Sequence, residues 1–579
     1  MGPGGQLDDG VYGLAPFLVG NAEYRTIGHF FMAVQDGLDF GRVYVDAARY
    51  DHVGPPVHQK QVAILVQVAH VAVGKQALFH AALAFVRVAV VLEIFGGQIA
   101  HVHIPDLADR AGVAVGLKNS HGYAIDGDRQ MWPFRDWVIK AFNDDMPYDE
   151  FARMQLAGDI LKPGKEGTAA VGFLVAGTHN TVLGSSDQMK RQARQDELEE
   201  IVGTVTQGFL GLTVHCARCH DHKTDPIPNS EYYRVAAALA GVRHGTRHGM
   251  FSVRPANPGV MRIHHRGSAG DLGDEVTPGG VAALQGLSAE FKLAGNSSDA
   301  QRRQALAAWV TAPANPLFAR VIVNRLWHYH FGRGIVETPS DFGAGGGRPS
   351  HPELLDWLAG WFRRNSYSLK ALHRLIVTSE TWRQSSASRP AALARDSGNS
   401  LLWRFSPRRV EAEVLRDSIL QVAGVLNTHH GGPGYEDVRE QHFNAGRYYH
   451  PIEVKGAKFN RRTIYRFSPR GARDALLDTF DCPDPSTTSP RRAVTTTPLQ
   501  ALSLSNNPFV WRMADSFAAR VRKEAGGEVL RQLELAWRLC FGRPPAGGEI
   551  SRGRRLVEKQ GLSSLCRVLF NSSEFVLIE

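Results

Sequence analysis

The pattern of apolar and polar positions changes character near residue 119. Before that point the apolar runs, such as Val62–Val66 and Val88–Leu92, form neither a helical stripe nor a regular alternation. Two explanations stay open for residues 1–118: a small, poorly specified domain, or a coding error upstream that replaced the authentic start. Local signals that contradict one another argue against foldability, so we favour the second and leave residues 1–118 without an assigned fold.

From residue 119 onward, apolar residues recur at helical spacing. The segment 187–212 is typical, because Leu198, Ile201, Val205 and Phe209 fall on one face of a helix. Further helices are predicted from Trp132 through Phe142, from Pro147 onward, and at 231–240, 316–331, 368–382, 408–427, 508–523, 527–541 and 561–571. The sequence therefore predicts a mainly α protein.

Capping signals and irregular stretches divide this helical part. Ser350-His351-Pro352-Glu353 has the spacing of a capping box, and Thr495-Thr496-Thr497-Pro498 is typical of a helix entry. Residues 243–290, rich in Gly, His and Arg, predict loops with short strands. We expect a multi-helical two-domain protein with minor β structure: a first domain at 119–245, an irregular linker at 246–300 and a second domain at 301–579.

Composition restricts the partners. The chain has 579 residues, 43% of them hydrophobic and 21% charged, which is ordinary for globular domains. The net charge of +9 is compatible with an acidic or sulfated polysaccharide as partner. The basic pairs are scattered along the chain and do not alternate with aromatic residues, so a nucleic-acid partner is disfavoured.

Targeting signals are not visible in the sequence. The amino end shows no secretory signal peptide, since Met1-Gly2-Pro3-Gly4 lacks a basic region and no clean apolar segment with a cleavage site follows. The apolar run Ala81–Phe95 is broken by Arg87 and Glu93, so no transmembrane segment is expected. Taken alone, these features predict a cytoplasmic location.

Five cysteines in so long a chain do not make a disulfide framework, but two of them form a motif. Cys216-Ala217-Arg218-Cys219-His220 is a Cys-x-x-Cys-His pentad. In such a pentad both thiols form thioethers with haem vinyl groups and the histidine supplies the proximal iron ligand. The cofactor-binding residues predicted for haem c are therefore Cys216, Cys219 and His220, with His220 on the iron.

An alternative for the same segment is a metal site without haem. Cys216, Cys219 and His222 have spacing compatible with three zinc ligands, but a second Cys-x-x-Cys or histidine pair downstream is missing. A regulatory disulfide and an inert site are further alternatives. Catalytic residues are unknown, because the sequence contains no nucleophile elbow, phosphate-binding loop or zinc-protease helix motif.

Longer motifs carry a resemblance to a known family. The first region contains Asp126-Gly127-Asp128-Arg129, Trp132-Pro133-Phe134-Arg135-Asp136-Trp137, Gln155-Leu156-Ala157-Gly158-Asp159, Leu210-Gly211-Leu212-Thr213-Val214 and Cys219–Lys223 followed by Asp225–Pro228. The second contains Asn324-Arg325-Leu326-Trp327, Phe331-Gly332-Arg333-Gly334, Asp341-Phe342-Gly343 and Thr497-Pro498-Leu499-Gln500-Ala501-Leu502. The chain thereby resembles Planctomycete-type cytochrome C proteins, which carry a cytochrome-associated domain and a partner domain, both of unknown function.

The resemblance implies a periplasmic or cell-envelope protein with haem c and a redox partner protein. It also implies electron transfer linked to the breakdown of complex polysaccharide. The chain departs from the family pattern in two respects. A signal peptide and a separate cytochrome-like module with its own haem motif are not visible, and the middle region is short.

Overall fold

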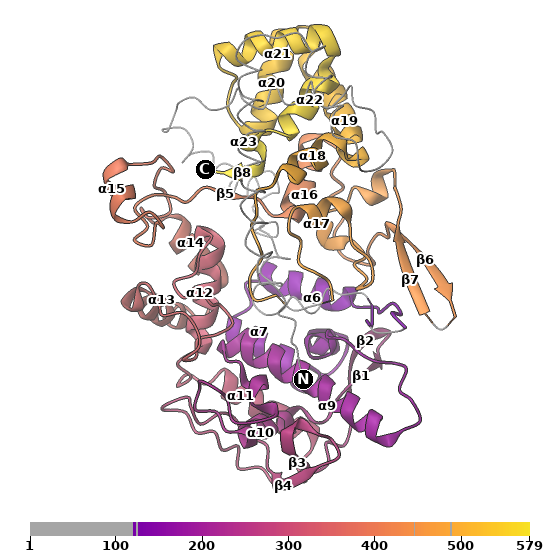
Figure 1. Cartoon of the computed structure of the whole chain (residues 1–579), viewed down its shortest axis with the longest axis vertical. Coiled ribbons are helices and arrows are strands. Elements are labelled where there is room, and N and C mark those ends of the chain that lie inside the picture. Colours follow the sequence, from indigo (N-terminus) through magenta and orange to yellow (C-terminus); the bar gives the residue numbers. More distant parts are fainter. Residues whose placement is uncertain (1–119, 123–124, 445, 487–488) are drawn as a thin grey trace, which may run out of the picture. The chain divides into compact units, whose positions relative to one another are not determined.

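The computed structural model describes residues 120–122, 125–444, 446–486 and 489–579; the expectation for residues 1–118 lies outside them. The described part is mainly helical, and each of its sheets is a two-stranded antiparallel pair (Figure 1), which confirms the predicted fold class. The longer helices are α6 (Trp132–Asn143), α7 (Tyr148–Leu161), α9 (Asp187–Leu210), α10 (Asn229–Leu239), α11 (Asp299–Val310), α12 (Phe318–Phe331), α13 (Pro352–Arg364), α14 (Leu369–Val377), α16 (Ala412–Val422), α18 (Pro498–Asn506), α19 (Pro508–Ala525), α20 (Val529–Phe541), α21 (Gly547–Gln560) and α22 (Leu562–Phe570).

Helix α9 shows why the periodic segments were predictable. The Ser186 hydroxyl accepts a hydrogen bond from the Met189 amide and caps its first turn. Gly211, with φ of 60°, ends it in the left-handed conformation that glycine adopts without strain. Leu198, Val205 and the rest of the predicted apolar face are buried. The helix ends directly before the cysteine motif, as its pattern indicates.

The capping box predicted at Ser350 is wrong. Helix α13 is capped at His351, has Pro352 at its first position and shows no hydrogen bond from a capping side chain. Ser350 instead contacts a distant part of the chain, because its amide donates to the Ile335 carbonyl at 2.9 Å. A tertiary contact has therefore displaced the local capping arrangement.

Two other predicted helices are longer than the observed ones. Helix α14 ends at Val377, and turns follow it. Helix α16 begins at Ala412, since the two preceding arginines form strand β5 (Arg408–Arg409), which pairs with β8 (Leu577–Ile578) near the carboxyl end. A partner so distant in sequence leaves no local signal.

Two hairpins occupy the stretch predicted to form loops with short strands, and the first of them begins before the predicted linker. Strand β1 (Val242–Arg247) pairs with β2 (Met250–Pro255), and β3 (Met261–His264) pairs with β4 (Leu272–Val276). A third hairpin joins β6 (Val438–Phe443) to β7 (Gly446–Pro451).

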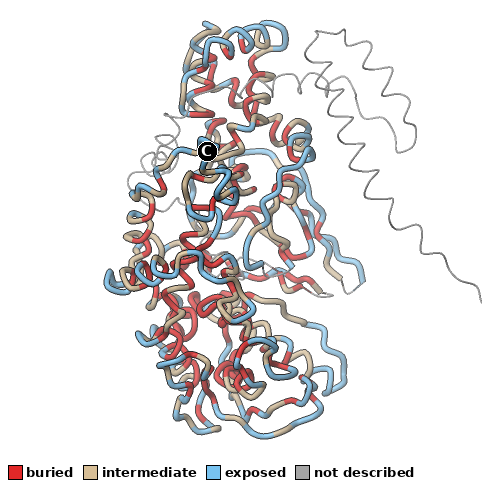
Figure 2. Tube along the Cα trace, turned by 60° about the vertical axis from the view of Figure 1, so that its left-hand side comes forward, coloured by how far each residue is buried: buried red, intermediate tan, exposed pale blue. Residues whose placement is uncertain are grey.

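Buried apolar residues form two main clusters, shown with the other buried positions in red in Figure 2. The first runs from Met131 to Tyr465 and takes in residues on both sides of the hairpins, while the second runs from Val410 to Phe575. The domain limits themselves stay a prediction.

The first described residues are held by residues far along the chain. The Ser120 hydroxyl accepts a hydrogen bond from the Arg470 amide at 2.7 Å, across 350 positions of sequence. The Asp126 carboxylate accepts from the Gly471 amide at 2.9 Å, and the Asp126 carbonyl accepts from the Tyr449 hydroxyl at 2.6 Å. This corner around Asp126 therefore forms only when the segment that begins at residue 120 and the segment 449–471 are both present.

Gly167 allows helices α7 and α8 (Lys165–Ala170) to pack closely. A methyl group there would lie 2.1 Å from the Gly158 carbonyl oxygen and 2.2 Å from that of Lys162.

We expect Gly167→Ala to lower the free energy of unfolding by about 2 kcal/mol, because backbone overpacking outweighs the better helix propensity of alanine. Urea denaturation measures the change. Gly295→Ala, whose methyl group would meet nothing within 4 Å, is the control; equal losses would contradict the packing argument.

Candidate functional site

The Cys-x-x-Cys-His pentad begins on a short 3-10 helix, η6 (Val214–Arg218), which follows α9, and Cys219 and His220 come directly after this helix. Cys216, Cys219 and His220 are exposed, whereas Ala217 and Arg218 between them are buried. Both cysteines are free thiols. The structure thus places all three residues predicted for haem attachment on the surface, on a backbone anchored by the two residues between the cysteines.

Arg218 provides the anchor. One guanidinium nitrogen lies 2.8 Å from the Asp196 carboxylate and another hydrogen-bonds to Glu199, both on α9. Its carbonyl accepts hydrogen bonds from the Tyr233 hydroxyl at 3.0 Å and from the Asn229 side-chain amide at 2.8 Å. These contacts hold the middle of the pentad against α9 and α10 while the cysteines face outward.

His220 has a defined tautomer. Its Nδ1 lies 2.6 Å from the Asp221 carbonyl oxygen, which can only accept, so Nδ1 carries the proton. Nε2 is then left with a lone pair. Histidines that ligate metals commonly donate their other ring N–H to a carbonyl in this way.

His222 faces a different environment. Its side chain is 7% exposed, Nδ1 accepts from the Asp225 amide at 2.9 Å, and Nε2 donates to the Thr213 hydroxyl at 2.9 Å. Among the described residues, Cys216, Cys219 and His222 do not form a group whose ligand atoms lie within 4.8 Å of one another. The structure brings His222 into the loop's hydrogen-bond network and not to the two sulfurs.

The second sequence region forms part of the base of this loop. The Phe342 amide donates to the Gly211 carbonyl at 2.7 Å, and the Ala344 amide donates to Asp225 Oδ1 at 2.5 Å. A methyl group at Gly343 would lie 2.2 Å from Asp225 Oδ2, so the close approach requires glycine. Asp341-Phe342-Gly343 therefore packs against the segment that follows the pentad.

The surroundings of Cys216 disfavour its thiolate form. Burial raises the pKa of Cys216, a hydrogen bond with Thr213 opposes this, and the nearby carboxylates of Asp341 and Glu199 raise it further. Because the thiolate is the reactive form, Cys216 is not an activated nucleophile in this structure.

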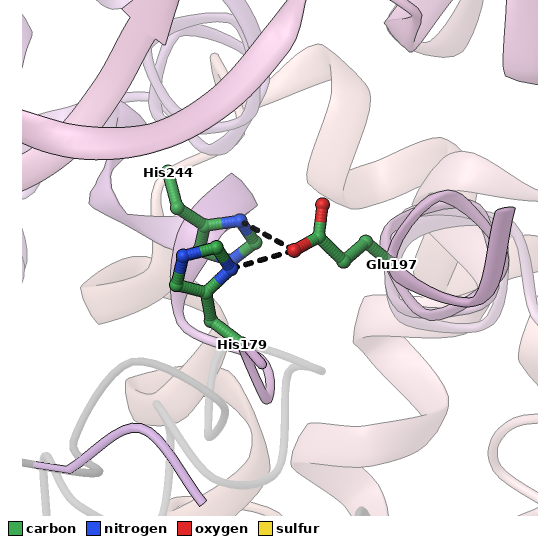
Figure 3. Close-up of side chains that lie close together, drawn as sticks. All are labelled: His179, Glu197 and His244. Carbon is green, nitrogen blue, oxygen red and sulfur yellow. Dashed lines mark hydrogen bonds and ion pairs between the residues drawn. The ribbon is translucent and has the colours of Figure 1, made fainter. Parts of the chain in front are cut away.

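A second polar cluster, absent from the sequence predictions, joins His179, Glu197 and His244 (Figure 3). Burial alone would raise the pKa of Glu197, but hydrogen bonds from His179 and Arg194 lower it below the usual value. Burial, with the charges of His179 and Arg129, lowers the pKa of His244 well below 6.5. The three residues stand far apart in the chain without motif spacing, so no local signal could have revealed them.

The motifs that carry the family resemblance contribute many contacts between the two regions. Besides the Asp126 corner, the Asp136 carboxylate accepts from the Gly432 amide at 2.6 Å. Asp159 forms an ion pair with Arg303 at 2.7 Å, and an Arg325 side-chain nitrogen donates to the Gln207 carbonyl at 3.1 Å. Much of the motif chemistry is therefore structural, whereas Cys216, Cys219 and His220 of the pentad are exposed.

Two family models match the chain. Residues 109–244 match PSCyt2, a protein of unknown function (DUF1549), and residues 302–557 match PSD1, a protein of unknown function (DUF1553). No curated protein and no solved structure matches the chain significantly. None of the helices in the described ranges combines the length and apolar character needed to cross a membrane.

Proposed function

Since the chain belongs to the Planctomycete-type cytochrome C family, whose two domains of unknown function occur as a pair, we propose that it binds haem c covalently. Cys216 and Cys219 would hold the porphyrin through thioether bonds, and His220 would ligate the iron. Bound haem would supply one-electron redox chemistry, and the function would be electron transfer to or from a partner protein.

The observation that carries the proposal is that the cysteines and the histidine of the pentad are exposed, whereas the two residues between the cysteines are buried. Both thiols and the His220 ring are exposed, while Arg218 is fixed by two carboxylates and by hydrogen bonds to its carbonyl. A cofactor can therefore approach the two sulfurs without unfolding the loop. The hydrogen bond to the Asp221 carbonyl leaves His220 Nε2 for iron, so the donor set fits haem c.

The alternative is a non-redox metal-binding scaffold, or a metal-dependent hydrolase, with zinc at Cys216, Cys219 and His222. His222 would have to give up hydrogen bonds with Thr213 and the Asp225 amide to reach such an ion. Each of these bonds contributes about 1 kcal/mol in folded proteins. The geometry therefore favours haem attachment over zinc at this segment.

A role in polysaccharide breakdown and a periplasmic or cell-envelope location rest on the family resemblance. The net charge of +9 supports contact with an acidic or sulfated polysaccharide, which would be attracted over a salt-dependent range. In this proposal the chain supplies or removes electrons for an enzyme that modifies such a polymer.

Haem staining of the full chain tests the proposal. The chain, fused to an export signal, is produced with a c-type maturation system and analysed on a denaturing gel and by pyridine haemochrome spectroscopy. We expect covalent haem in the unaltered protein and in a Cys482→Ala control, and complete loss in Cys216→Ala, Cys219→Ala. His220→Ala is expected to change the iron spectrum, because the proximal ligand is lost.

A folded, colourless protein would refute haem attachment. Metal analysis then decides the alternative: stoichiometric zinc that disappears in the double cysteine variant and in His222→Ala would establish a zinc site at the loop.

A further inference from the structure

The side chains of His179, Glu197 and His244 converge from three separate elements (Figure 3). His179 lies in the loop before α9, Glu197 on α9 itself, and His244 in strand β1. One ligand atom from each lies within 4.8 Å of the other two. Two imidazoles and one carboxylate make a donor set suited to divalent transition metals.

One face of α9 holds this arrangement together. Arg194, Glu197 and Glu200 follow one another at intervals of three, so they share a face of the helix. Glu200 accepts hydrogen bonds from the Thr178 amide at 2.9 Å and the Thr178 hydroxyl at 2.8 Å, directly beside His179. The loop carrying the first histidine is thus fixed to the helix that carries the carboxylate.

Arg194 fixes the second histidine in the same way. Its guanidinium donates to the Val242 carbonyl at 2.7 Å and to the Ala240 carbonyl at 3.2 Å, at the start of the strand that contains His244. It also donates to Glu197 Oε2 at 3.0 Å. The carboxylate is therefore oriented through one oxygen, and Oε1 is directed at the two imidazoles.

His244 is the unexplained group in this cluster. Its side chain is 2% exposed, and neither ring nitrogen has a hydrogen-bond partner among the residues that the structure describes. Nδ1 lies 3.8 Å from Glu197 Oε1, too far for a hydrogen bond, and the ring stacks on that of His179 at 4.3 Å. A buried polar group without a partner costs about 1–3 kcal/mol, so its persistence here points to a ligand.

We propose that His179, Glu197 and His244 bind a divalent transition metal ion such as zinc or iron(II). Two atoms that each lie about 2.1 Å from one ion are separated by roughly 3–3.4 Å. The distances from Glu197 Oε1 to the two Nδ1 atoms are 2.6 Å for His179 and 3.8 Å for His244, which bracket that value. Binding also requires one imidazole to rotate, because the two rings are stacked with their planes 14° apart and their lone pairs are nearly parallel.

Solvent reaches the site from the side of His179, whose side chain is 25% exposed, and Glu197, which is 16% exposed. Three protein ligands leave at least one coordination position for water or a substrate, as in catalytic zinc and non-haem iron sites. The neighbouring His121 is already engaged, because its Nδ1 accepts from Arg129 Nε at 3.0 Å. The proposed ligand set is therefore these three residues.

Zinc titration of the full, untagged chain tests the site. All variants carry Cys216→Ser and Cys219→Ser, so that haem and thiol-bound zinc are excluded and the result is independent of the proposed haem function. The protein is stripped with a chelator and titrated calorimetrically with zinc chloride near neutral pH. His248→Gln, in the exposed turn between β1 and β2, is the matched histidine control.

We expect one zinc ion per chain in the cysteine-free background and in the His248→Gln control. Glu197→Gln and His244→Gln are expected to bind at least about 100-fold more weakly, more than is usual for loss of an outer-shell contact. Zinc should raise the Tm of the cysteine-free background and of the His248→Gln control, and it should leave the Tm of the two ligand variants unchanged. Two ligand variants are used so that one suffices if the other does not fold, as judged by circular dichroism. No binding in the background, or equal affinity in all four proteins, would overturn the proposal.

Discussion

Replacing Arg303 with methionine is expected to lower the free energy of unfolding by about 3–5 kcal/mol. The Arg303 side chain is 0% exposed, and its guanidinium lies 2.7 Å from Asp159 Oδ1 and 2.8 Å from Asp299 Oδ2. Methionine has a similar length but no charge, so both buried carboxylates would lose this partner. Among the described residues, only Asp159 keeps another guanidinium partner, that of Arg247 at 2.8 Å.

Urea denaturation of the full chain, followed by circular dichroism, measures this loss. Arg333→Met is the matched control, because Arg333 pairs with Glu337 at 3.0 Å where both side chains are about half exposed. Exposed pairs of this kind contribute about 0.3–0.5 kcal/mol. If the two methionine variants unfold at the same urea concentration, the buried ion pair does not stabilise the fold as argued.

Acid is expected to destabilise the protein through His373. Burial lowers the pKa of this histidine from 6.5 to about 4, and its Nδ1 lies 2.8 Å from Nε2 of His330. Between pH 6.5 and 4 the unfolded chain binds a proton here that the folded chain does not. The contribution to stability is therefore complete above pH 6.5 and falls by about 3 kcal/mol as the pH approaches 4.

The difference in unfolding free energy between pH 7 and pH 4.5, compared for wild type and His373→Gln, measures this effect. The variant should lose less, because glutamine does not titrate. Both proteins contain His121, whose pKa is lowered to about 3 by burial and by the charge of Arg129. Part of the acid sensitivity therefore remains in the variant. An identical loss in both proteins would show that His373 is protonated in the folded state.

Helices with a clear apolar stripe and local end signals could be predicted to within a few residues. Helix α9 has both Ser186 and Gly211 at its ends, and α19 and α20 follow their predicted ranges closely. The errors occur where distant residues compete with local preferences. The Ser350 amide donates to the distant Ile335 carbonyl, and Arg408–Arg409 pair with the last strand, so neither follows the helix signal around it.

The two candidate sites also differ in whether local sequence or contacts between distant residues create them. The cysteine pentad is contiguous, so its residue types and spacing were visible in the sequence, and the structure adds only their exposure and the tautomer of His220. The histidine and glutamate cluster depends on the packing of a loop, a helix and a strand. It could be found only once Thr178, Arg194 and Glu200 had been seen to hold those elements together.

The contact between Ser120 and Arg470, far apart in the described chain, has a consequence for synthesis. Ser120 cannot meet Arg470 until 350 further residues have been translated. At about 5–20 residues per second, that wait lasts roughly 20–70 s. Throughout it the corner at Asp126 is open and part of the first apolar cluster stays incomplete, so apolar surface of the nascent chain stays exposed for that time.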